Sequence, residues 1–164
     1  PAVSTIGELL KREGLVRHRR RRAATHGRLE SGRTVASAAN VVWTADFKGH
    51  FRVGTGEYCY PLTVLDLHHH YLLGCLAFPT TAVALARRGF ARLFAEYGLP
   101  EVIRTDNGVP FASPNALFNL SKLSVWWLRL GIAIERIKPA HPQQNGRHER
   151  IHGHMKPVCS RPST

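Results

Sequence analysis

Three carboxylate residues, Asp46, Asp106 and Glu149, have the types and positions expected of a phosphoryl-transfer site. Asp46 ends an apolar, β-branched run, and Asp106 ends another such run just before the turn residues Asn107 and Gly108. In open α/β sheets, sites form in the crevice beyond the strand ends, so the two Asp side chains converge if their strands are neighbours. Glu149 lies in a predicted helix that could lean over the same edge.

Together, the three carboxylates predict a site for Mg²⁺ or Mn²⁺, because these ions prefer hard oxygen ligands. We expect two ions about 3.5–4 Å apart, which would activate an attacking oxygen and stabilise a leaving oxygen at phosphorus. Taken singly, each residue has a simpler interpretation. An Asp before Asn-Gly, as at Asp106, is often only a turn former, and Glu149 could simply face water on a charged helix.

The predicted helix over residues 143–156 places further polar groups beside Glu149. At a 3.6-residue period, the residues on the Glu149 face are Asn145, His152 and Lys156, and those flanking it are Arg147, His148 and Arg150. We expect this face to bind a metal ion and the substrate phosphate next to it, with Asn145, Arg147, Arg150 and Lys156 as DNA-binding residues. Ordinary surface pairing along the helix is the alternative.

Positive charge is concentrated at both ends of the chain. The net charge is +12 overall, with +6 in residues 1–33, +1 in residues 34–135 and +5 in residues 136–164. A polyanion is the natural partner, because Lys and Arg displace counterions from phosphates. The run Arg19, Arg20, Arg21 and Arg22 is too dense in charge to pack against itself, so we expect a solvated arm that contacts DNA.

Several classes of protein are disfavoured by composition. No apolar run reaches the roughly 18 residues of a membrane-spanning helix, and no apolar stretch follows the basic amino end as in a signal peptide. Three widely spaced cysteines without a CxxC pair argue against a zinc finger or a disulfide framework. We therefore expect reduced thiols, a cytoplasmic location and no membrane partner.

The pattern of apolar residues predicts alternating strands and helices. Strands are expected over 41–47, 58–67, 71–78, 102–106 and 132–137, and helices over 80–97, from Leu117 to Leu130, and over 143–156. This order predicts an α/β fold, a mixed sheet with flanking helices. The expected organisation is a basic arm or linker over 1–39, a core over 40–156 and a short tail over 157–164.

Three sequence blocks resemble the catalytic core of the integrase and transposase superfamily with a D,D,E triad, and bacterial insertion-sequence transposases in particular. The blocks are Trp43-Thr44-Ala45-Asp46-Phe47, Arg104-Thr105-Asp106-Asn107-Gly108-Val109-Pro110-Phe111 and His141-Pro142-Gln143-Gln144-Asn145-Gly146-Arg147-His148-Glu149-Arg150. The resemblance implies a ribonuclease H-like fold with a five-stranded mixed sheet. It also implies Mg²⁺-dependent DNA strand cleavage and transfer by an oligomer on bacterial nucleoid DNA.

The resemblance puts Asp46, Asp106 and Glu149 on the triad positions and Lys156 on a basic position that contacts DNA. This chain departs from the family's pattern in places. Residues 113–125 look like an insertion found in some bacterial members, and His69-His70 stands where relatives commonly have Ser-Arg. A metal site at His68–His70 is conceivable but disfavoured, because neighbouring residues of a strand alternate between faces.

Three hypotheses about function follow. The first is a transposase catalytic core, an enzyme of the polynucleotidyl transferase type. The second is a truncated and inactive transposase remnant that only binds DNA, because the chain begins at Pro1 and the usual flanking regions are missing, so that we expect a fragment. The third is an unrelated basic RNA-binding protein, in which Asp46, Asp106 and Glu149 would not converge.

Overall fold

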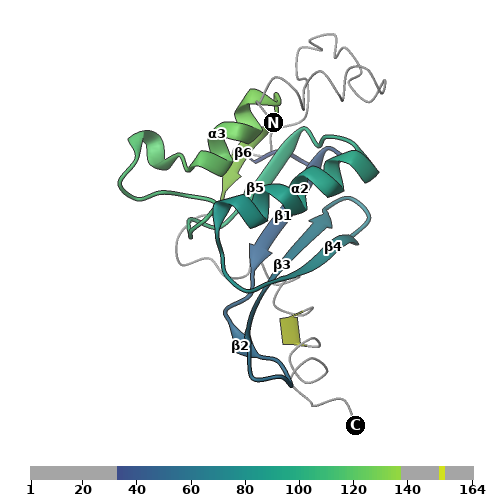
Figure 1. Ribbon diagram of the computed structural model, residues 1–164. Helices are drawn as coiled ribbons and strands as arrows, with labels where there is room; N and C mark the ends of the chain where they lie inside the picture. Colours follow the sequence, from purple (N-terminus) through teal and green to yellow (C-terminus); the bar gives the residue numbers. More distant parts are fainter. Residues whose placement is uncertain (1–32, 138–151, 154–164) are drawn as a thin grey trace. The chain divides into compact units, whose positions relative to one another are not determined.

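The computed structural model describes residues 33–137 and 152–153 (Figure 1). Its centre is a mixed sheet in the order β4-β3-β1-β5-β6, with the short β2 paired to the first residues of β3. The strands are β1 (Val42–Phe47), β2 (Phe51–Arg52), β3 (Tyr58–Asp66), β4 (Tyr71–Phe78), β5 (Val102–Thr105) and β6 (Ala133–Arg136). β3 runs antiparallel to β1 and β4, whereas β1, β5 and β6 are parallel to one another.

One face of this sheet carries the hydrophobic core. Along β1, Trp43 and Ala45 point into the core, and the alternation of a strand puts Thr44 and Asp46 on the opposite face. Two helices pack over the core, α2 (Val83–Tyr97) and α3 (Lys122–Arg129). Their buried side chains, with those of the strands, form one cluster that includes Leu62, Val64, Phe90, Leu93, Phe94, Ile103, Phe111, Leu123 and Trp127.

α2 lies unusually close to β4, because Gly89 has no side chain at the contact. A Cβ atom at Gly89 would lie 2.6 Å from Cδ1 of Leu76 and 3.1 Å from Cζ of Phe78. A larger residue at Gly89 would therefore require the Leu76 and Phe78 side chains to shift. α2 ends at Gly98, whose φ of 85° suits glycine.

The helix predicted from Leu117 to Leu130 is shorter in the structure. The 3₁₀ turn η1 (Leu117–Asn119) is separated from α3, which begins after Ser121. The Ser121 side chain accepts a hydrogen bond from the Ser124 backbone N–H and caps the helix at this point. The helical spacing of Leu117 and Leu120 was therefore misleading, since both residues lie before α3. Leu117 belongs to η1, and Leu120 directly follows that turn.

The predicted fold class, a mixed α/β sheet with flanking helices, is confirmed, with β2 as an additional strand. Of the helix predicted over 143–156, only His152 and Gly153 lie in the described part of the chain, and they are helical. The predicted boundaries at residues 39 and 156 stay predictions. Among the described residues, no helix is long and apolar enough to cross a membrane.

Candidate active site

Asp46 and Asp106 occupy adjacent positions at the carboxyl ends of two parallel strands. β1 and β5 pair with Ala45 opposite Thr105. Asp46 directly follows Ala45, and Asp106 directly follows Thr105. The alternation along the strands puts both on the face opposite the core. The two sequence motifs, sixty residues apart, thus meet at one edge of the sheet.

Asp106 is oriented by the turn that follows it. Its Oδ1 accepts a hydrogen bond of 3.0 Å from the Gly108 backbone N–H, a local bond that Asp makes readily in turns. A Cβ atom at Gly108 would lie 3.0 Å from Oδ2 and 3.4 Å from Oδ1 of Asp106. Glycine therefore leaves the space in which this carboxylate sits. Asn107 fixes the turn to the next strand by donating a 3.0 Å hydrogen bond to the carbonyl of Ile137.

Arg136 ties this turn to the core beneath it. One guanidinium nitrogen, Nη1, donates to Thr105 Oγ1 at 2.6 Å and to the Asp106 carbonyl at 3.3 Å. The other, Nη2, donates to the Phe111 carbonyl at 2.7 Å and to Ser124 Oγ at 2.8 Å. Burial lowers the pKa of Arg136 and the Asp106 charge raises it, but a guanidinium stays charged at neutral pH. The Asp106 turn and α3 are thus joined through one planar group.

Asp46 has polar neighbours from two other elements. Thr63 on β3 is its direct partner across the antiparallel pair, and so shares its face. His152 is 5% exposed, and its Nε2 lies 3.0 Å from Thr63 Oγ1, within hydrogen-bonding distance. Its Nδ1 lies 3.7 Å from Asp46 Oδ2, which is too long for a hydrogen bond.

The charge of His152 follows from its surroundings. Burial, together with the smaller effect of the positive charge of Lys48, lowers the pKa of His152 to about 4. The imidazole is therefore neutral at pH 7, and its contact with Thr63 is a neutral hydrogen bond. Sequence reasoning singled out His152 as a neighbour of Glu149, but it missed Thr63. The register of β3 against β1, which puts Thr63 opposite Asp46, has no signal in the local pattern.

Most other predicted site residues lie outside the described residues. These are Glu149, Asn145, Arg147, Arg150 and Lys156 in the predicted helix, and Arg19, Arg20, Arg21 and Arg22 in the predicted arm. Within the described residues, no group of three or more His, Cys, Asp or Glu side chains could hold a metal ion. The structure thus brings together two of the three predicted ligands, and the third belongs to a segment it does not describe.

The donor set at this edge fits a divalent ion such as Mg²⁺. Asp46 and Asp106 offer carboxylate oxygens on one face of the sheet, and Mg²⁺ is commonly held by one or two carboxylates while it keeps several waters. The triplet His68–His70 gives no comparable site, because it lies in the turn between β3 and β4.

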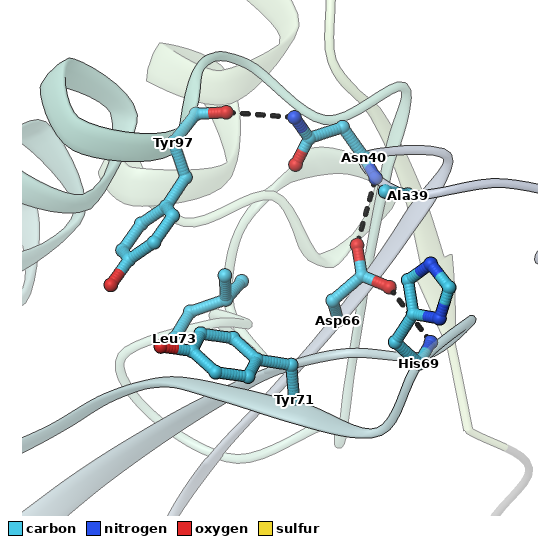
Figure 2. A pocket seen from close by; sticks show the side chains of 7 residues that line it. All are labelled: Ala39, Asn40, Asp66, His69, Tyr71, Leu73 and Tyr97. Atoms are coloured by element: carbon cyan, nitrogen blue, oxygen red, sulfur yellow. Dashed lines mark hydrogen bonds between the residues drawn. The ribbon is translucent and has the colours of Figure 1, made fainter.

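A pocket lies at the other end of β1, away from Asp46 and Asp106. It has a volume of about 310 Å³ and is lined by Ala39, Asn40, Asp66, His69, Tyr71, Leu73 and Tyr97 (Figure 2). The carboxylate of Asp66 accepts backbone N–H bonds from Asn40 at 2.7 Å, His68 at 2.9 Å and His69 at 3.3 Å. Asp66 is the aspartate of this chain that does not belong to the candidate active site. It holds the loops at this end of β1 together.

Comparison with known proteins gives two findings. Residues 36–142 match the family model described as integrase core domain. Among solved structures, the chain resembles the simian T-cell lymphotropic virus intasome in complex with PP2A regulatory subunit B56 gamma, at 22% identity and a TM-score of 0.59. The match covers 70% of this chain and 37% of the viral one, so this chain spans little more than a third of that relative's length.

The HTLV-2 integrase catalytic core domain, solved in complex with magnesium, is similar in both a dimeric and a trimeric form. The dimeric form matches at 17% identity and a TM-score of 0.57, over 73% of this chain and 69% of that one. The trimeric form matches at 18% identity and a TM-score of 0.54, over 70% and 65%. These likenesses confirm the predicted ribonuclease H-like fold.

The family match covers well over half of the chain and includes both strands that carry the Asp residues. It confirms the predicted resemblance to the integrase core. The chain belongs to the integrase core domain family.

Proposed function

We propose that this chain is the catalytic core of a transposase that cleaves DNA strands and joins them to new sites, with Mg²⁺ or Mn²⁺ as cofactor. The observation that carries the proposal is the adjacency of Asp46 and Asp106 on β1 and β5. Two carboxylates on one face of a sheet edge repel each other, and a shared divalent cation relieves that repulsion. The match to the integrase core family supports the same reaction class.

Glu149 is the proposed third ligand. It precedes His152 by three residues, and in the helix predicted over 143–156 the two residues lie on the same face. His152 itself contacts Thr63 and lies near Asp46. A helix held at His152 would therefore bring a residue one turn earlier toward the same edge. We propose that His152 acts in this way as a positioning residue rather than as a metal ligand.

When held by these carboxylates, two Mg²⁺ or Mn²⁺ ions would activate the attacking oxygen and stabilise the leaving oxygen of an in-line displacement. The chain's own residues supply the geometry. Asp46 is fixed by a buried strand, and Asp106 by the Gly108 N–H and by the Arg136 network beneath its turn. Neutral His152 packs beside Asp46 without adding a charge to the site.

DNA is the proposed substrate and partner. The chain has a net charge of +12 and a pI near 10.6. We propose that Lys156, Asn145, Arg147 and Arg150 hold the phosphate being transferred, while Arg19–Arg22 bind duplex DNA without sequence preference. The HTLV-2 relative was solved with magnesium and in dimeric and trimeric forms. By analogy, we propose a homo-oligomer assembled on bacterial nucleoid DNA.

A strand-joining assay tests the proposal. The chain is incubated with end-labelled DNA and Mg²⁺, and the Asp106→Asn variant is measured beside a matched control, Glu57→Gln, at an exposed carboxylate of the β2–β3 turn. We expect Asp106→Asn to lower the rate about 100- to 1000-fold, since a catalytic metal contributes several kcal/mol to the barrier. Glu57→Gln should leave it unchanged.

Two outcomes would contradict the proposal. If the unaltered chain binds DNA but neither cleaves nor joins it with Mg²⁺ or Mn²⁺, it is the inactive DNA-binding remnant. If Asp106→Asn and Glu57→Gln are equally active, the assigned site is wrong. Calorimetric measurement of Mg²⁺ binding separates these outcomes. A metal site at Asp46 and Asp106 predicts weaker Mg²⁺ binding by the Asp106→Asn variant even without turnover.

A further inference from the structure

An apolar projection follows the Asp106 turn and has no role in the proposed reaction. The loop between Ala112 and Leu120 closes on itself by a single β-bridge between these two residues, and it leads into α3 (Figure 1). At its end are Leu117, 79% exposed, and Phe118, 83% exposed, which we call the apolar tip. They are the most exposed large hydrophobic residues in the described part of the chain. Water disfavours such exposure, so a contact partner is expected.

The backbone holds the apolar tip outward at a conformational cost. Phe118 has a φ of 53° and Asn119 a φ of 55°, in the left-handed region that non-glycine residues avoid. Hydrogen bonds fix this shape, from Asn119 N to the Ala116 carbonyl at 2.9 Å and from Ser113 N to the Asn119 carbonyl at 3.1 Å. Strain of this kind persists where the surroundings enforce it, and it often marks a functional contact.

The base of the loop is built into the scaffold that holds Asp106. Ser121 Oγ donates a 3.0 Å hydrogen bond to the Phe111 carbonyl, at the other side of the loop's base. The same carbonyl accepts from Arg136 Nη2, and Arg136 Nη1 donates to the Asp106 carbonyl. The apolar tip and the Asp106 turn are therefore parts of one hydrogen-bonded unit. Whatever the apolar tip contacts is fixed relative to the candidate active site.

The composition of the segment selects the kind of partner. From Asn107 to Ser121 there is no charged residue, although the chain carries 23 Lys and Arg. This segment cannot hold phosphate by charge, but an aromatic ring can stack on a nucleobase or wedge between base pairs. The next residue, Lys122, is exposed at the first turn of α3 and can contact the adjacent phosphate. A second copy of the chain is the other occupant to test, since residues 34–135 carry a net charge of only +1, and the experiment below distinguishes it.

We propose that the apolar tip is a DNA-distorting element, in which Phe118 stacks on or between bases next to the strand handled at Asp46 and Asp106. This inference rests on the proposed function for its substrate. Leu117 would widen the wedge, and Lys122 would anchor the backbone of the same nucleotides. Such insertion would unstack a base step and bend the duplex, which would make the strand more accessible to the proposed active site.

Fluorescence of 2-aminopurine in the DNA substrate, with binding isotherms at two salt concentrations, tests this inference on the full chain. Phe118→Ala should weaken binding about 5- to 150-fold, the range measured for loss of one base–aromatic stack, and abolish the rise in 2-aminopurine signal. Phe118→Trp should preserve both. Tyr71→Ala, at an aromatic residue 58% exposed on β4, is the matched control and should change neither.

Salt dependence separates stacking from charge. Phe118→Ala should leave the slope of binding against salt unchanged, whereas Lys122→Ala should reduce it by about one phosphate contact. If Phe118→Ala binds like the unaltered chain and the 2-aminopurine signal persists, the inference is overturned. It is also overturned if Phe118→Ala changes only the sedimentation of the protein without DNA, because the apolar tip is then a contact between copies.

Failure of this inference is distinguishable from failure of the proposed function. A chain that joins DNA with Mg²⁺ but is indifferent to Phe118→Ala in binding and fluorescence contradicts only the stacking role. A chain that never joins DNA, yet loses binding and the 2-aminopurine signal in Phe118→Ala, supports the stacking role and contradicts the catalytic assignment.

Discussion

Aspartate side chains lie at both ends of β1, yet their surroundings differ. At the amino end, the buried Asp66 accepts three backbone N–H bonds, and Asn40 joins the same loops by donating to the Tyr97 carbonyl at 2.7 Å (Figure 2). At the carboxyl end, Asp106 accepts one such bond, from Gly108. Asp46 there lies beside it on the next strand.

This difference indicates which carboxylates stabilise the fold and which are available for chemistry. A carboxylate whose oxygens accept buried backbone N–H bonds contributes to stability, because its loss leaves those donors unsatisfied. Two carboxylates at neighbouring strand ends, such as Asp46 and Asp106, are the arrangement that the proposed function uses to hold a cation. The two ends should therefore respond differently to the loss of a negative charge.

The largest expected effect is on catalysis at the carboxyl end. Asp46→Asn should lower strand joining about 100- to 1000-fold, because it removes an ionised metal ligand. The free energy of unfolding in urea without metal should fall by no more than about 0.5 kcal/mol, or should rise, since a like-charge contact is removed. Joining at a normal rate by this variant would place the chemistry elsewhere.

The matching change at the amino end should give the reverse result. Asp66→Asn weakens bonds to a charged acceptor and turns an amide N–H₂ toward backbone donors, which should cost about 1.5–3 kcal/mol of stability in urea unfolding. Strand joining per folded molecule should not change. A loss of joining without a loss of stability would mean that the two ends of β1 are coupled.

Replacement of Arg136 tests how the carboxyl end is supported. Arg136→Lys keeps the charge but offers a single nitrogen to the four oxygens that the guanidinium contacts, so we expect a loss of about 1–2 kcal/mol in urea unfolding. Arg129→Lys, at an exposed arginine in the last turn of α3, is the control and should be neutral. If the Arg136→Lys variant is as stable as the unaltered chain, then charge alone, and not the planar shape of the guanidinium, holds the Asp106 turn.

The smallest effect is expected at Gly108. Gly108→Ala adds a methyl group 3.0 Å from Asp106 Oδ2, which should displace that carboxylate slightly and lower joining about tenfold. A higher Mg²⁺ concentration should recover part of the rate, as titration of the metal in the joining assay would reveal. Gly49→Ala, where an added Cβ meets nothing within 4 Å, should behave like the unaltered chain.

Much of the fold was predictable, because its strands are short apolar runs with clear ends. The predicted strands 41–47 and 71–78 correspond to β1 and β4 within one residue. The helix from Leu117 failed, since apolar spacing does not reveal that Ser121 is a better cap than anything before it. β2 was missed because two residues of pairing carry no periodicity.

The candidate site was predictable only in part. Asp46 and Asp106 were identified because each ends a strand, and their adjacency followed once β1 and β5 were neighbours. Thr63 was not identified, because its position beside Asp46 depends on the register between β1 and β3. Local sequence patterns do not encode that register. The structural role of Asp66 also depends on loops from three parts of the chain.

The close approach of α2 to β4 at Gly89 limits which residue this position can carry. Leu76 and Phe78 occupy the space that a side chain at this position would need, so a larger residue here requires these two side chains to shift. A change of residue at this point of α2 would therefore also rearrange the side chains of β4.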